Sequence, residues 1–193
     1  MGGTLMVSGN MRVLARVGGN HSAINWNSSN MVGCTIFCIQ YTYRSYASSG
    51  GSGINLTFNG DSDNADYRNM AHIFDYRIQY YNDGDPFGPK GSTTNLLWYA
   101  IENANVPQMN GYYTGLTNDG NSGEMWVKNN MKDSSYTLWT HRGVNWDQYN
   151  YIGGQSQIGL YSTSGQITSI LFTASGSSGQ FTNFQGVLWG GTD

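Results

Sequence analysis

Apolar and polar residues alternate with a period of two along much of the chain, and this pattern predicts β-strands. In residues 54–59, Ile, Leu and Phe alternate with Asn, Thr and Asn, which is typical of a half-buried strand. Residues 70–81 show the same alternation. Two runs rich in β-branched and aromatic residues, 167–173 and 181–189, are joined by a Ser/Gly-rich stretch. This arrangement predicts a strand, a turn and a second strand.

The remaining apolar runs are also short and bounded by turn residues. Residues 32–46 are apolar at both odd and even positions, which predicts a central strand covered on two sides. Residues 94–104 do not distinguish strand from helix, and residues 82–94, with Asp83-Gly84 and two prolines, predict a turn-rich loop. Further candidate strands lie at 96–101, 125–127, 136–141 and 158–161. The eight to ten short strands predict an all-β fold, a jelly-roll-like antiparallel β-sandwich.

The N-terminal segment differs from the rest of the chain in its pattern of apolar and polar residues. Two short apolar runs, 5–7 and 11–17, are split by Ser-Gly-Asn and followed by Gly-Gly-Asn. This pattern predicts either an N-terminal arm that anchors the protein to a neighbour or an edge hairpin, over residues 1–30. Residues 31–193 then form the sandwich domain, which is long enough for one substantial core.

Composition and charge narrow the class of protein. Only 11% of residues are charged, against about 25% in an average globular protein, but 38% are hydrophobic and 14% aromatic, which is enough to fold. The net charge is −3 and the nine Lys and Arg residues are scattered, which argues against nucleic acid as a partner. No apolar run approaches the roughly 20 residues of a membrane span, and the N-terminus lacks a signal-peptide pattern. We therefore expect folding in the cytoplasm.

The two cysteines, Cys34 and Cys38, are predicted to remain free. Four residues of extended strand span about 13 Å, beyond the roughly 7 Å between Cα atoms that a disulfide allows. Both thiols are expected on one side of the strand as small buried hydrophobes, in keeping with a reducing compartment. A metal pair is the alternative, but no CxxC or matched His/Cys set accompanies them.

Catalytic motifs are missing from the sequence. It contains no GxSxG elbow, no HExxH, no P-loop and no GxGxxG. The two glutamates, Glu102 and Glu124, do not form the paired-carboxylate motif that a retaining glycosidase would show. We expect no enzymatic activity, no catalytic residues and no bound cofactor. A further candidate cation site is a calcium loop at Asp61, Asp63 and Asp66, which lacks the Gly and Glu of an EF-hand; the alternative is a solvated loop that caps its own turn amides.

Aromatic residues near polar loops are the main candidates for recognition. Exposed aromatic rings beside amides and carboxylates suit sugar binding, whereas the same residue types also fill cores and subunit contacts. The candidate ligand or partner surface is Tyr112, Tyr113, Trp126, Trp146, Tyr149 and Tyr151.

Three segments resemble sequences that recur in virion proteins of tailed bacteriophages, especially phages of cyanobacteria and other aquatic hosts. They are INLTFNGDSDNADY at 54–67, the strand that starts GEMWV and its successor at 123–142, and the stretch 167–190 with its closing hydrophobic-x-Gly. They occur in the same order as in that family. The resemblance implies a jelly-roll module displayed on the particle, as a capsid decoration (cement) protein or as a tail adhesin.

The favoured hypothesis is a capsid decoration protein. It would be assembled in the host cytoplasm, bind the major capsid protein or other virion subunits as a trimer, and use residues 1–30 as its anchor. Deleting these residues should then abolish capsid binding without unfolding the sandwich. The alternative is a tail-associated, lectin-like receptor-binding module that binds a glycan. A polysaccharide-degrading enzyme would need Glu124 and an aspartate to converge in one groove.

Overall fold

A computed structural model describes most of the chain from residue 11 onward. The described residues are 11–27, 29–46, 53–63, 66–77, 97–101, 108–109, 119–129, 136–146, 151–162, 165–174 and 179–192. For the strand residues 45–46, 70–77, 97–101, 108, 119, 145–146 and 151–153, the description is confined to the backbone. The predicted loop 82–94 lies outside these ranges.

The described residues form twelve β-strands and one short 3₁₀ helix, so the predicted all-β fold is confirmed. Residues 94–104, whose pattern is ambiguous, contain a strand. The elements are β1 (Arg12–His21), β2 (Ala23–Asn27), η1 (Ser29–Met31), β3 (Ile36–Tyr46), β4 (Ile54–Phe58), β5 (Tyr67–Arg77), β6 (Leu97–Ile101), β7 (Gln108–Met109), β8 (Asp119–Lys128), β9 (Thr137–Trp146), β10 (Tyr151–Tyr161), β11 (Ser169–Ala174) and β12 (Gln180–Gly191).

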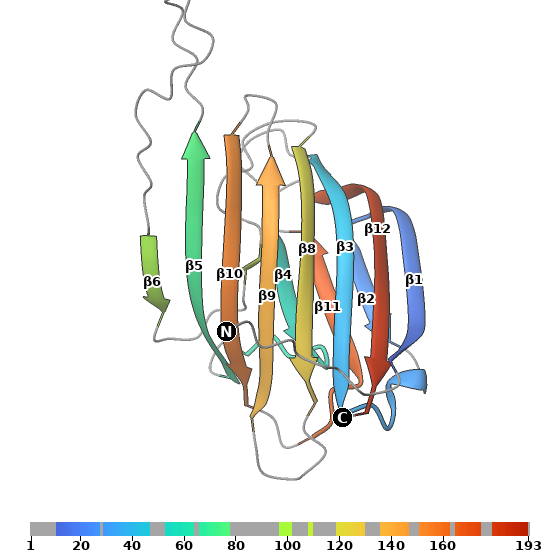
Figure 1. Ribbon diagram of the computed structural model, residues 1–193. Helices are drawn as coiled ribbons and strands as arrows, with labels where there is room; N and C mark the ends of the chain where they lie inside the picture. Colours follow the sequence, from blue (N-terminus) through green and yellow to red (C-terminus); the bar gives the residue numbers. More distant parts are fainter. Residues whose placement is uncertain are drawn as a thin grey trace, which may run out of the picture.

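The strands form two antiparallel sheets packed face to face. Within the described residues, the larger sheet has the order β1-β12-β3-β8-β9-β10-β5-β6 and the smaller has the order β2-β11-β4-β7. Figure 1 shows the larger sheet in front, with β2, β4 and β11 behind it. In Figure 1 the strands β2, β11 and β4 lie behind the middle of the larger sheet, between β12 and β9, and β5 and β6 lie at one end of that sheet.

The connections give the sandwich its jelly-roll-like topology. Among the described strands, the chain changes sheet at every step except β5–β6, β8–β9 and β9–β10. When β5, β6, β9 and β10 are left out, the remaining strands form two sets of four, β1-β12-β3-β8 and β2-β11-β4-β7. The chain crosses between the sets at every step but the one from β4 to β7, as in a double Greek key. The hairpin β9–β10 and the pair β5–β6 are additions to this eight-strand core.

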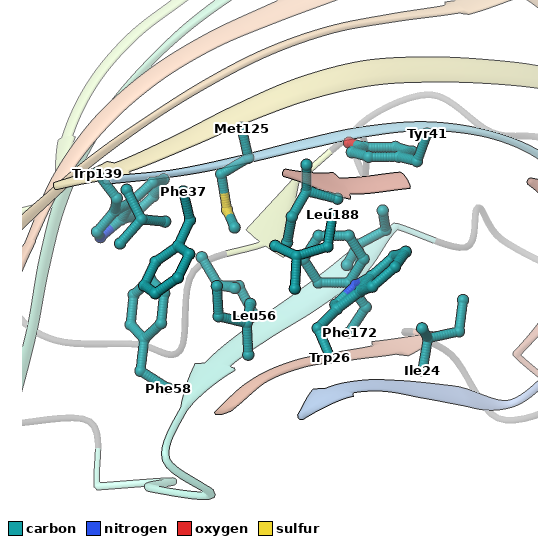
Figure 2. Close-up of a cluster of buried hydrophobic side chains, with 14 of the residues drawn as sticks. Ile24, Trp26, Phe37, Tyr41, Leu56, Phe58, Met125, Trp139, Phe172 and Leu188 are labelled. Carbon is teal, nitrogen blue, oxygen red and sulfur yellow. The ribbon is translucent and has the colours of Figure 1, made fainter. Parts of the chain in front are cut away.

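The core lies between the two sheets and is rich in aromatic rings. Figure 2 shows Phe37, Met125 and Trp139 of the larger sheet facing Leu56 and Phe58 of the smaller sheet. Trp26 and Phe172 pack edge to face, with ring centroids 6.1 Å apart. Burial of large apolar side chains at about 25 cal/mol per Å² is the main force that holds the sheets together.

The prediction that 32–46 is covered on both sides is wrong for most of β3. Its side chains alternate: Phe37, Ile39, Tyr41 and Tyr43 are buried, while residues 40, 42 and 44 are exposed. The smaller sheet covers only the inner face of β3, and the outer face meets solvent. The apolar residue Cys38 on the outer face obscures this alternation in the sequence.

The N-terminal strands belong to the sandwich. Strand β1 pairs with β12, where Arg12 stands opposite Gly190, and β2 pairs with β11, where Ile24 stands opposite Phe172. Residues 12–27 are thus edge strands of two different sheets and form neither a separate arm nor a single hairpin. Residues 1–10 lie outside the described part. A truncation at residue 30 would expose the edges of β12 and β11, so it does not isolate an anchor function.

Candidate functional site

A band of mostly polar side chains crosses five adjacent strands on the outer face of the larger sheet. The band contains one row of five residues in which each residue stands opposite the next across neighbouring strands. The row is Val187 of β12, Gln40 of β3, Glu124 of β8, Arg142 of β9 and Ser156 of β10. Their neighbours along each strand are buried in the sandwich, except for the half-buried Gly123. Since successive side chains on a strand point to opposite faces, this row points to solvent.

A shallow groove of about 820 Å³ follows this band. Backbone of Gly123, Gly143 and Gly186 contributes to its surface. The outward-facing residues that line it are Gln40, Thr42, Ser122, Glu124, Arg142, Val144, Ser156, Gln185 and Val187. The lining therefore combines amides, hydroxyls, a carboxylate and a guanidinium, with two valines.

Glu124 is held in a fixed position in the groove. The Gln40 side-chain amide donates to its Oε2 at 3.0 Å, and the Trp126 indole N–H donates to its Oε1 at 2.6 Å. The two donors come from β3 and β8, so the carboxylate is oriented by the sheet itself. A carboxylate can accept about four hydrogen bonds, so two acceptor positions remain for a ligand.

Arg142 stands opposite Glu124 in the register but does not pair with it. Its side chain is exposed, and the structure records no hydrogen bond or ion pair between Arg142 and any residue it describes. Both oxygens of Glu124 instead face donors on β3 and β8. The guanidinium therefore remains available to bind a hydrogen-bond acceptor in the groove.

The two cysteines are buried and free, as predicted, but they do not share a face. Cys34 precedes β3 and belongs to the core between the sheets. Cys38 stands opposite Trp126 and Trp189 on the outer face. Burial, together with the charge of Glu124, raises the pKa of the Cys38 thiol to about 12, so it is protonated at neutral pH. The prediction of one shared face fails because strand geometry begins only at Ile36.

A buried tyrosine–histidine pair lies on the inner face, beneath the groove. The Tyr41 hydroxyl and His141 Nε2 are hydrogen-bonded at 2.7 Å. Burial raises the pKa of Tyr41 well above its usual value and lowers the pKa of His141 to about 3. Gly123 leaves room for the pair, because a Cβ there would lie 2.6 Å from Tyr41 Cζ. Both rings are therefore neutral and structural.

Of the six aromatic residues proposed from the sequence as a ligand surface, the structure places one beside the groove. Trp126 is half-buried, and its indole N–H orients Glu124. The backbones of Trp146 and Tyr151 lie at the adjoining ends of β9 and β10. Tyr112, Tyr113 and Tyr149 lie outside the described residues.

The candidate calcium loop is organised by its own hydrogen bonds. Asp61 Oδ1 accepts from the Asp63 amide at 2.8 Å, and Asp61 Oδ2 accepts from the Tyr161 hydroxyl at 2.9 Å. Desolvation and the neighbouring Asp61 raise the pKa of Asp66. Within the ranges that the structure covers, no group of three or more His, Cys, Asp or Glu side chains could hold a metal ion. The geometry of Asp61 matches the alternative, a capped turn.

An apolar patch adjoins the groove on the outer face of β9 and β10. It consists of the exposed residues Leu138, Ile158 and Leu160, and Leu138 stands directly opposite Leu160. Exposed apolar groups that lie together on one sheet face are typical of contact surfaces.

Fold and groove together define a jelly-roll-like β-sandwich with a polar surface groove on its larger sheet. Comparison with protein-family models, curated proteins and solved structures finds no match to this chain. The ranges that the structure covers contain no helix long and apolar enough to cross a membrane.

Sequence reasoning missed most of the groove. Gln40, Arg142 and Gln185 are absent from the residues proposed as a ligand surface, although the polar positions 40, 42 and 44 recur every second residue. That spacing is the signal that could have identified an exposed strand face.

Proposed function

We propose that the protein is a non-enzymatic carbohydrate-binding module whose ligand lies in the groove on the larger sheet. The observation that carries this proposal is the Glu124 carboxylate, fixed by Gln40 and Trp126 within a groove of amides and hydroxyls. Sugar hydroxyls both donate and accept hydrogen bonds, and the groove offers both partners. Because the residues sit on paired strands, little ordering is needed when a ligand binds.

The composition of the groove favours binding over glycoside hydrolysis. Hydrolysis requires two carboxyl groups, about 5 Å apart in retaining enzymes and about 6.5–9.5 Å apart in inverting enzymes. Among the described residues that line the groove, Glu124 is the one carboxylate, and its cross-strand neighbour is Arg142.

Filling the groove should weaken carbohydrate binding strongly. Thr42 is exposed and lines the groove, so Thr42→Trp should occupy the space of the ligand and weaken binding at least tenfold. Val32→Trp, at an exposed position outside the groove lining, should leave binding unchanged. Binding is measured on an array of neutral, uronate-containing and sulfated oligosaccharides, followed by calorimetry. If no oligosaccharide binds at millimolar concentration, the carbohydrate-binding proposal is wrong.

A second candidate is a capsid decoration protein, which the sequence resemblance to phage virion proteins and the apolar patch both favour. Leu138, Ile158 and Leu160 would then pack against a neighbouring virion subunit. Burial of such a patch stabilises an assembled shell by mass action. In a virion, a carbohydrate-binding module would instead serve as a tail-associated receptor-binding protein.

The number of copies per virus particle distinguishes a capsid decoration protein from a tail-associated receptor-binding protein. A decoration protein should be present in hundreds of copies, and a tail module in about three to eighteen, as set by shell and tail symmetry. Quantitative mass spectrometry of purified particles, referenced to the major shell protein, gives this number. Absence from the particles would refute both virion settings and leave carbohydrate binding to be tested on its own.

A further inference from the structure

The groove presents a hydrogen-bond acceptor and a hydrogen-bond donor side by side, and neither satisfies the other. Glu124 and Arg142 are cross-strand partners, so their Cβ atoms lie about 4.5–5.5 Å apart. Glu124 accepts from Gln40 and Trp126, and Arg142 makes no hydrogen bond or ion pair with the described residues. A ligand that enters from the solvent side can therefore form hydrogen bonds with both Glu124 and Arg142.

We infer that the groove recognises a neutral sugar residue through two adjacent ring hydroxyls, one donating to Glu124 and the other accepting from Arg142. This inference rests on the proposed carbohydrate-binding function and names its ligand class. Adjacent hydroxyls of a pyranose project from neighbouring carbons and match a donor and an acceptor on neighbouring strands. Hydrogen bonds to charged groups are about twice as strong as those between neutral groups, so this pair sets the specificity.

The charges around the groove disfavour an acidic glycan. The Glu124 carboxylate would repel a uronate or sulfate bound at Arg142. Three other cationic residues of the described part lie on this face, each four residues along its strand from this row, or about 13 Å: Lys128, Arg44 and Arg68. Arg16 of β1 lies in the row itself but four strands away, or about 19 Å at the usual strand spacing. Both distances exceed the screening length of about 8–10 Å at physiological salt. A single guanidinium beside a carboxylate therefore selects hydroxyl groups over anions.

Trp126 acts as a positioning residue in this arrangement. Its indole N–H holds Glu124 Oε1 at 2.6 Å, which leaves the outer lone pairs of the carboxylate directed to the ligand. Trp126→Phe retains an aromatic ring and removes the donor. If the indole N–H positions Glu124, this variant should weaken binding nearly as much as Glu124→Gln. If Trp126 instead contributes through its ring alone, the variant should hardly change binding.

The test combines ligand variants with protein variants. Wild-type protein should bind neutral hexose oligosaccharides on the array, and the strongest of these is titrated by calorimetry beside its monodeoxy analogues. Loss of either hydroxyl of the pair should weaken binding at least tenfold, since a polar site rejects an analogue that leaves its groups unpaired. Glu124→Gln and Arg142→Gln should each weaken binding at least tenfold. Arg16→Gln, a matched exposed arginine outside the groove lining, should change it less than twofold.

The possible results distinguish a failure of the inferred ligand class from a failure of the proposed carbohydrate-binding function. Neutral binding that is sensitive to Glu124, to Arg142 and to one hydroxyl pair supports the inference. Binding of acidic oligosaccharides alone, lost in Arg142→Gln but retained in Glu124→Gln, would overturn the ligand class and leave the carbohydrate-binding function intact. Neutral binding that is insensitive to both variants would overturn the assigned contacts. Absence of all oligosaccharide binding would overturn the proposed function itself.

Discussion

Replacing Gly159 with alanine should lower the free energy of unfolding by about 3 kcal/mol, because overpacking a filled core costs roughly 1–3 kcal/mol or more. A Cβ at residue 159 would lie 2.5 Å from Trp139 Nε1 and closer still to Cε2 and Cζ2. Trp139 is fully buried between the sheets, so its ring cannot move aside without displacing other core side chains. For a chain of this length, the melting temperature should fall by about 6–12 °C.

Thermal and denaturant unfolding of matched variants measures this effect. Gly165→Ala is the control, because nothing lies within 4 Å of a Cβ at that exposed position. In a Trp139→Phe background the ring is smaller, so the added cost of Gly159→Ala should shrink markedly in a double-mutant cycle. An equal cost in both backgrounds would show that the contact with Trp139 is not the cause.

The stability of the protein should decrease below pH 6.5 because of His141. In the folded state burial lowers the pKa of His141 to about 3, whereas an unfolded histidine has a pKa of about 6.5. Between these values the unfolded state binds one more proton than the native state. Stability attributable to His141 is therefore complete above pH 6.5 and decreases as the pH falls, by about 1.4 kcal/mol per unit and about 5 kcal/mol in total near pH 3.

Comparison with His141→Gln isolates this contribution from that of the carboxylates. A glutamine amide can retain the hydrogen bond to the Tyr41 hydroxyl, which is 2.7 Å from His141 Nε2, but it does not titrate. The wild-type protein should lose stability more steeply than the variant between pH 6.5 and 3, in urea unfolding at a series of pH values. Parallel pH profiles for the two proteins would contradict a neutral, buried His141.

The fold class could be predicted from the sequence because each strand carries its own signal. The alternation at 54–58 and the run at 181–189 correspond to β4 and to most of β12, and these signals are local. The position of residues 12–27 could not be predicted. Their place depends on pairing with β12 and β11, more than 140 residues further along the chain in each case.

The assembly of the groove from distant residues could not be predicted for the same reason. The hydrogen bond between Gln40 and Glu124 joins residues 84 positions apart, and the pairing of Glu124 with Arg142 depends on the register of β8 and β9. Trp126 was recognisable as a candidate from its residue type, but its role as a donor to Glu124 depends on geometry that sequence patterns do not encode.

The place of β12 between β1 and β3 has a consequence for how the protein is made. A nascent chain contains β1 and β3 long before β12 is translated, and at about 5–20 residues per second the delay is on the order of 10 s. During that interval the facing edges of both strands have no partner, and open strand edges promote pairing between chains. Slower synthesis would lengthen this exposure, so the yield of soluble protein should depend on whether ribosome-associated chaperones shield the two strands until β12 inserts between them.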